Sequence, residues 1–118
     1  MPIKSYKELI VWQKGIELVG EVYVLTKQMP KSEIFSLISQ MQRAAISVPS
    51  NIAEGFGRKH SKEFSQFLSI AFGSSLELET QIIISKKQYP EINYSKVEAL
   101  MVEVQKMLRS LRTKASND

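Results

Sequence analysis

Polar side chains that can donate or accept hydrogen bonds recur at helical spacing between residues 43 and 58. These residues share one side of a predicted helix and comprise Arg43, Ser47, Ser50, Asn51, Glu54 and Arg58. Glu54 precedes Arg58 by four residues, the favourable order for an ion pair, and Arg43 can reach Ser47 in the same way. Such residues beside small alanines suit close contact with another backbone or with phosphate. The alternative is a solvated face, which usually carries lysine and glutamate, so we favour contact.

Enzymatic chemistry has little support in the residue types present. The single histidine, His60, belongs to no Glu-x-x-His pair, and Glu77 and Glu79 are two residues apart, so they point to different sides of a helix. The sequence contains no phosphate-cradling glycine loop and no cysteine. We therefore expect a protein without catalytic residues, cofactor or metal.

Basic residues suggest a different role. The chain has a formal net charge of +4 and a pI near 9.4, which favours an acidic partner, most often nucleic acid. The candidate phosphate contacts are Arg43, Arg58, Lys59, Lys86, Lys87, Arg109 and Arg112. Cations at the carboxyl end of a helix also suit the helix dipole, and this explanation of Arg58 and Lys59 stays open. For base stacking we expect exposed rings at Phe56, Tyr89 and Tyr94.

Apolar residues at steps of three and four predict four helices that position these side chains. The first is expected to run to about Gln28, and the second to end near Gly55 to Gly57 in a left-handed glycine cap. The expected start signals are, in chain order, Ser5 with Glu8, Ser32, Ser61, and Ser95 with Glu98. No alternating strand pattern occurs. The predicted fold is all-α, an antiparallel up-and-down four-helix bundle in a single domain, residues 1–118.

Pro49 lies inside the second predicted helix. The apolar stripe from Ile34 to Phe56 keeps its phase across this proline, which predicts one kinked helix rather than two. Pro49 cannot donate to the carbonyl of Ala45, and the hydroxyl of Ser47 or Ser50 is a candidate donor in its place.

The predicted helices are apolar on more sides than one bundle can cover. Ile70 and Ile84 remain outside the core stripe of the third helix, and Gly73 and Ser74 are small enough for a close crossing. We therefore expect a homo-oligomer. The first residues lack the apolar core of a signal peptide and no apolar run approaches the ~20 residues of a membrane span, so we expect a cytoplasmic protein without a membrane partner.

Two stretches, QMQRAAISVPSNIAEGFGR and KEFSQFL followed by GSSLELE, resemble the 23S ribosomal-RNA intervening-sequence proteins, a bacterial four-helix-bundle family. The residues that carry the resemblance are Ser47, Pro49, Asn51, Glu54, Gly55, Gly73 and Ser74. Members look like homopentameric rings. The similar accessory variability proteins of diversity-generating retroelements are basic rings that engage RNA and a reverse transcriptase. The resemblance thus implies a ring-like homo-oligomer, a pentamer by analogy, with RNA binding.

Two functions remain at this point. The first is a non-enzymatic oligomer that binds RNA or DNA through repeated basic patches. The second is a structural or adaptor ring that binds a protein partner, in which the basic charge is incidental.

Overall fold

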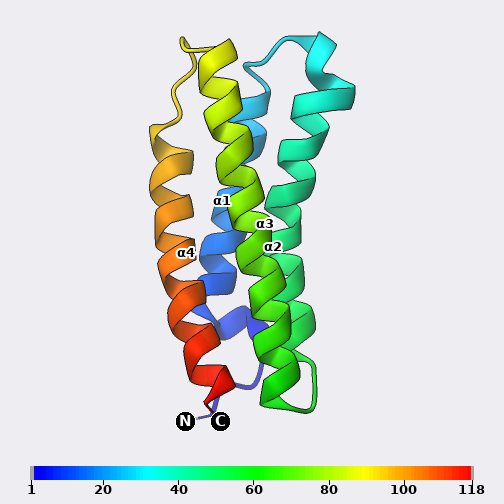
Figure 1. Cartoon of the computed structure of the whole chain (residues 1–118), viewed down its shortest axis with the longest axis vertical. Coiled ribbons are helices and arrows are strands. Elements are labelled where there is room, and N and C mark those ends of the chain that lie inside the picture. Colours follow the sequence, from blue (N-terminus) through cyan, green and yellow to red (C-terminus); the bar gives the residue numbers. More distant parts are fainter. Residues whose placement is uncertain (1, 118) are drawn as a thin grey trace.

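The amphipathic stripes form four α-helices in the computed structural model, which describes residues 2–117 (Figure 1). The helices are α1 (Ile10–Thr26), α2 (Ser39–Phe56), α3 (Ser61–Gln88) and α4 (Ser95–Ser116). Three short elements complete the described chain: the 3₁₀ turns η1 (Tyr6–Glu8) and η2 (Lys31–Glu33), and the π-helix η3 (Ile34–Ile38). No strand occurs in this part of the chain, which confirms the all-α prediction.

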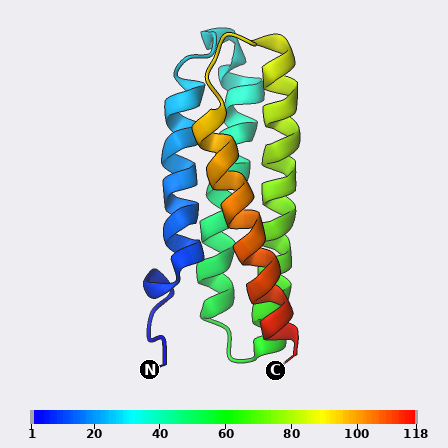
Figure 2. The same cartoon turned by 90° about the vertical axis from the view of Figure 1, so that its left-hand side faces the viewer.

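All four helices lie side by side along one long axis, in a body of 45 × 22 × 20 Å (Figures 1 and 2). The connection from α1 to α2 and the loop from α3 to α4 lie at one end, here called the upper end. The loop from α2 to α3 and the last turn of α4 lie at the opposite, lower end. The end of α4 therefore lies at the same end of the bundle as the loop from α2 to α3, which is in the middle of the sequence.

One apolar core joins the helices. Its fully buried large side chains include Leu18, Met41, Ile52, Leu68, Leu78 and Leu108. All four helices contribute, as the periodicity predicts. Burying one such side chain stabilises the fold by about 1.5–3 kcal/mol, so this core is the main source of stability.

The first two expected start signals differ from the structure. The Ser5 and Glu8 capping box is present, but it opens η1, because Leu9 then adopts extended backbone and α1 begins only at Ile10. Ser32 caps nothing: it lies inside η2, and α2 follows only after the π-helix η3.

The later boundaries also shift. Ser61 is the first residue of α3 rather than its cap. Ser95 donates its hydroxyl to Asn93, and Glu98 accepts from Lys86, so neither forms the expected capping box. The left-handed cap after α2 is wrong as well, because Gly57 has φ −75° and the Arg58 amide already bonds the Gly55 carbonyl.

Pro49 lies within α2, which is a single helix across this residue as predicted. Its buried ring packs against α1, where a Cβ placed on Gly15 would come within 3.3 Å of the Pro49 Cβ. Glycine at position 15 thus lets the two helices approach closely. The Ser47 hydroxyl bonds the Ser74 hydroxyl and not the Ala45 carbonyl, to which Pro49 cannot donate. Within residues 2–117 the Ser50 hydroxyl makes no hydrogen bond to this carbonyl either.

The length and apolarity of α3 differ from the expectation that no segment is long and apolar enough to span a membrane. An 18-residue window of this helix has a mean hydropathy of 1.3, enough by length and composition to cross a membrane. A buried core helix passes the same test, and α3 supplies Leu68, Leu78 and Ile82 to the core.

Candidate nucleic-acid interface

The polar stripe on α2 faces α3 in its middle part. The hydroxyl oxygens of Ser47 and Ser74 lie 2.7 Å apart, and the Asn51 amide donates to both the hydroxyl and the carbonyl of Ser47, at 2.9 and 2.8 Å. These side chains are half-buried. The seam therefore holds two helices of one chain together, and Ser47, Asn51 and Ser74 are not free to contact a ligand.

Gly55 continues this contact toward the lower end. A Cβ at this position would lie 2.6 Å from the Cβ of Phe67 on α3, closer than real atoms approach. Glycine is thus required where α2 and α3 pack most closely. Gly73 is different, because it is exposed and an added Cβ would meet nothing within 4 Å, so no close crossing occurs there inside the chain.

Arg58 is held on two sides. Its guanidinium donates to Glu54 at 2.9 Å, as the spacing predicts, and lies 4.7 Å from the centre of the Phe67 ring. Both partners of the ion pair are exposed, so the pair itself adds little stability. The predicted reach of Arg43 to Ser47 is wrong, because Ser47 is occupied by Asn51 and Ser74.

Two further arginines project from α4 onto α3. The guanidinium carbons of Arg109 and Arg112 lie 5.4 and 4.7 Å from the centre of the Phe72 ring. Neither has a carboxylate within 4.0 Å among residues 2–117. Stacking on an aromatic face orients a guanidinium while leaving its N–H donors available.

These arginines belong to the segments that meet toward the lower end of the bundle, which we call the basic end (Figure 1). Its six cations stand in the loop after α2 (Arg58 and Lys59), in the first turn of α3 (Lys62) and in the last two turns of α4 (Arg109, Arg112 and Lys114). A hollow of about 770 Å³ between the start of α3 and the end of α4 is lined by Lys59, His60 and Lys62. In sequence the acidic residues nearest these cations are Glu54, Glu63, Glu103 and Asp118. Of the six cations only Arg58 has a carboxylate partner within 4.0 Å in the described chain.

Lys62 is absent from the predicted phosphate contacts, and Lys114 is expected only as part of the basic end of the fourth helix. Lys62 stands in the first turn of α3 and Lys114 in the last turn of α4, fifty-two residues apart in sequence. Residues from both turns line one hollow, a proximity that no local sequence signal carries.

The other candidate cations lie elsewhere. Lys86 and Lys87 are in the last turn of α3 at the upper end, where Lys86 pairs with Glu98 at 2.9 Å. Arg43 is exposed on α2, thirteen residues before the last residue of this helix and therefore about 20 Å along the helix from the loop that carries Arg58. The seven predicted contacts thus do not form a single patch.

The three rings expected to be exposed are all packed. Tyr94 is only 4 % exposed; its hydroxyl donates to the Tyr89 carbonyl and lies 2.7 Å from the Ser85 hydroxyl. Phe56 is half-buried with its ring edge-on to Phe64. The prediction of stacking platforms at these positions is therefore wrong, because all three rings fill gaps at helix ends.

Tyr89, the third ring, donates its hydroxyl to Glu33 at 2.6 Å. Hydrogen bonds from Ser36 and then Tyr89 hold the pKa of Glu33 below its ordinary value. The same bond to Glu33 raises the pKa of Tyr89. The hydrogen bond between Tyr89 and Glu33 thus connects η2 to the end of α3.

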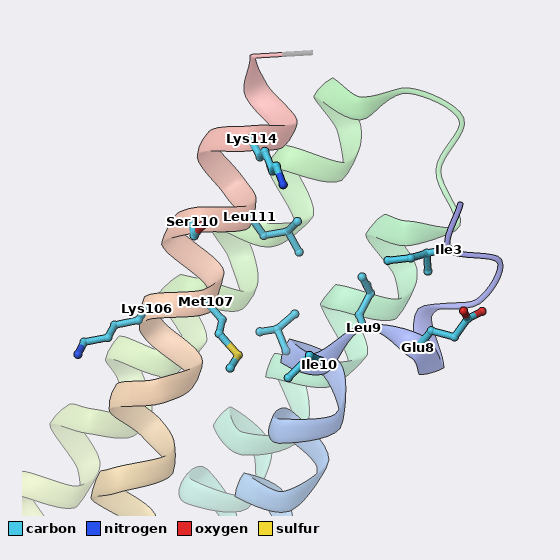
Figure 3. Close-up of a pocket in the computed structure, with 10 residues that line it drawn as sticks. Ile3, Glu8, Leu9, Ile10, Lys106, Met107, Ser110, Leu111 and Lys114 are labelled. Carbon is cyan, nitrogen blue, oxygen red and sulfur yellow. The ribbon is translucent and has the colours of Figure 1, made fainter. Parts of the chain in front are cut away.

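An apolar pocket of about 530 Å³ opens beside the basic end (Figure 3). Figure 3 shows Met107 and Leu111 of α4 opposite Leu9 and Ile10, with Lys114 above them. Ile10 is 61 % exposed, so water covers much of this apolar surface in the single chain. Such a pocket suits an apolar side chain of a partner.

Acidic residues and the histidine form no metal-binding cluster within residues 2–117. His60 is exposed and precedes α3 as its cap residue. The described side chains therefore offer cations, amides and aromatic rings rather than a metal site.

A family model matches most of the chain. The family model described as 23S rRNA-intervening sequence protein matches residues 7–110, which include α1, α2, α3 and most of α4. No curated protein matches the chain. The match covers the polar seam, Pro49 and Gly55, the positions that carry the resemblance in the sequence. The chain therefore belongs to the family of 23S rRNA-intervening sequence proteins.

Proposed function

We propose that this chain is a non-enzymatic, homo-oligomeric protein that binds RNA or DNA through its basic end. The observation that carries the proposal is that six cations stand on the loop after α2, the first turn of α3 and the last two turns of α4, segments that meet toward the lower end. Five of these cations have no carboxylate within 4.0 Å among residues 2–117. Unpaired cations in one cluster attract phosphate, because each contact releases a counterion from the nucleic acid.

The arginines of this cluster are already oriented. Arg58 rests on Phe67, and Arg109 and Arg112 rest on Phe72. A guanidinium held on a ring loses less freedom when it binds, and its planar donors match phosphate oxygens. Phosphate contacts position a protein without reading sequence, so little sequence preference is expected of the basic end.

Assembly would multiply this surface. We propose an antiparallel up-and-down bundle with a bend at Pro49, assembled in the cytoplasm into a ring, pentameric by the family resemblance. Exposed apolar residues on the outer face of α3 support subunit contact: Ile70, Leu76, Ile83 and Ile84. In a ring each basic end recurs, and several weak patches on one nucleic acid act together.

The test is fluorescence anisotropy of labelled structured RNA and duplex DNA across a salt titration, with oligomeric mass measured by light scattering. The variant Arg58→Gln/Lys59→Gln removes two charges from the basic end. Lys86→Gln/Lys87→Gln is a matched control, since it also removes one ion-paired and one unpaired cation. We expect the first variant to flatten the slope of log affinity against log salt by up to about 2 per subunit, and the control to leave it nearly unchanged.

Three results would contradict the proposal. They are no binding by the wild-type protein at low salt, equal losses in the two double variants, or loss of the oligomer in the first variant. The last result would mean that Arg58 and Lys59 serve assembly.

The second candidate is an adaptor that binds a protein partner. The apolar pocket of Figure 3 favours it, because its walls are mostly apolar and suit the apolar side of an amphipathic partner segment, with Lys114 and Glu8 as its charged borders. Substitution Met107→Asp would abolish capture of such a partner while leaving RNA binding intact. If Met107→Asp instead weakened RNA binding as strongly as Arg58→Gln/Lys59→Gln, the adaptor function would have no support.

A further inference from the structure

A smaller pocket lies between α2 and α3 toward the upper end, separate from the basic end. It has a volume of about 300 Å³, at the lower limit of small-molecule sites. Side chains of η3 and the first turns of α2 form one wall, and Glu77 and Gln81 of α3 form the other. We call it the α2–α3 pocket.

Gln81 is the unusual residue of this pocket. It is only 7 % exposed, and its amide oxygen is fully buried without a hydrogen-bond donor. A buried acceptor without a donor is costly and rare, so a ligand N–H that reaches this oxygen would gain free energy on binding.

Phe35 stands at the rim with its ring 96 % exposed. It lies in the π-helix η3, in which Leu37 and Ile38 are turned toward the core and Phe35 is turned outward. One-turn π segments occur often at functional sites. A free aromatic face beside a polar pocket suits the stacking of a planar ring.

Arg43 and Glu77 supply opposite charges at the same pocket. Both are exposed, and neither has an ion-pair partner within 4.0 Å in the described chain, although they line one cavity. Glu77 stands four residues before Gln81, so the carboxylate and the amide lie on one face of α3. Both groups are thus available to one ligand.

We propose that the α2–α3 pocket binds one unpaired guanine base of a single-stranded nucleic acid. Phe35 stacks on the base, the Glu77 carboxylate accepts from its N1–H, and the amide oxygen of Gln81 accepts from its 2-amino group. Arg43 contacts the adjoining phosphate. This inference rests on the proposed function, to which it adds recognition of a base.

The ligand groups of the pocket favour guanine over the other bases. An ionised carboxylate only accepts hydrogen bonds, so its partner must donate. Guanine alone presents two adjacent donors, the ring N1–H for the Glu77 carboxylate and the 2-amino group for the Gln81 amide oxygen. Adenine and cytosine present one amino group next to ring acceptors, which a carboxylate repels.

The test uses short labelled uridine oligonucleotides with one central guanine, inosine or adenine, followed by anisotropy. Inosine lacks only the 2-amino group. We expect affinity to fall about 3- to 10-fold with inosine and about 10-fold or more with adenine. The Gln81→Leu and Glu77→Gln variants should lose this preference, and Phe35→Ala should weaken all three ligands about equally, because stacking is tolerant of base identity.

Two features keep the test decisive. Gln81→Leu removes a buried amide oxygen without a donor, so it is expected to fold at least as stably as the wild type. Ile84→Ala is the control, an exposed apolar residue of α3 that does not line the pocket, and it should leave the guanine preference unchanged. Equal affinity for the three oligonucleotides, or a preference that survives in Gln81→Leu and Glu77→Gln, would overturn the proposal.

The outcome also separates this inference from the proposed function. Salt-dependent binding that is lost in Arg58→Gln/Lys59→Gln, without a guanine preference, would refute the base pocket alone. A guanine preference with no loss in that double variant would retain the pocket and refute the basic end. Loss of oligomeric mass in Phe35→Ala without any guanine preference would assign Phe35 to subunit contact and overturn the proposal.

Discussion

The hydroxyl oxygens of Ser47 and Ser74 lie 2.7 Å apart and connect α2 to α3 through side chains twenty-seven residues apart in sequence. Ser47 also accepts from the Asn51 amide at 2.9 Å. The bond between the two serines is the central link of the polar seam, and it explains why small polar residues occupy these positions.

A double-mutant cycle with Ser47→Ala and Ser74→Ala measures this link. We expect a coupling energy of about 0.5–1.5 kcal/mol in urea unfolding, the net value of a typical internal hydrogen bond. Ser47→Ala should cost more than Ser74→Ala, because it also removes an acceptor from Asn51. Strictly additive losses would mean that the two hydroxyls bond water rather than each other.

Gly55→Ala is expected to destabilise the protein by about 1–3 kcal/mol. The new Cβ would lie 2.6 Å from the Cβ of Phe67, so α2 and α3 would have to move apart. Gly73→Ala is the matched control: its added methyl group meets nothing within 4 Å, and alanine favours a helix by up to about 1 kcal/mol. Thermal and urea unfolding of both variants measure the difference. Similar changes in the two variants would refute the close approach at Gly55.

Tyr89→Phe should reduce stability in a pH-dependent way. The pKa of Glu33 is lowered in the folded state, so Glu33 contributes stability above its unfolded value, near 4.5, that is lost as the pH falls through its folded pKa. Without the Tyr89 hydroxyl this contribution shrinks. The difference in unfolding free energy between wild type and variant should therefore be larger at about pH 7 than at about pH 3. A constant difference across this range would contradict the hydrogen bond.

At alkaline pH the stability depends on the other partner of this hydrogen bond, Tyr89. The pKa of Tyr89 is raised in the folded state, so its contribution is complete below the unfolded value of 10.0 and is lost as the pH rises through the folded pKa. Tyr89→Phe should abolish this loss, which urea unfolding at alkaline pH can measure.

Pro49→Ala is expected to disturb assembly more than the stability of the single chain. Alanine restores an N–H for the Ala45 carbonyl, which offsets the loss of the proline ring packed near Gly15. A straighter α2 would change the outer surface that Ile16 and Ile46 form beside Pro49. Light scattering and urea unfolding separate the two effects, and an unchanged oligomeric mass would count against the prediction.

Local sequence predicted the helices well but their first residues poorly. Apolar spacing is a property of each segment, and it identified α1 to α4 and the continuity of α2 across Pro49. Caps depend on backbone angles that several partners compete to set. The Ser95 hydroxyl donates to Asn93, and Glu98 accepts from Lys86 on α3, so neither residue makes the capping bonds that its type predicts.

The sequence by itself determined the all-α fold, the net positive charge and the Glu54 to Arg58 pair, because each follows from composition or from spacing within one helix. Only the tertiary structure decided which cations meet. It joined Lys62 and Lys114 to the basic end, buried Tyr94, exposed Phe35 and left the amide oxygen of Gln81 without a donor. These features depend on which helix ends lie together and on how the π-helix turns its side chains, and contacts between distant segments set both.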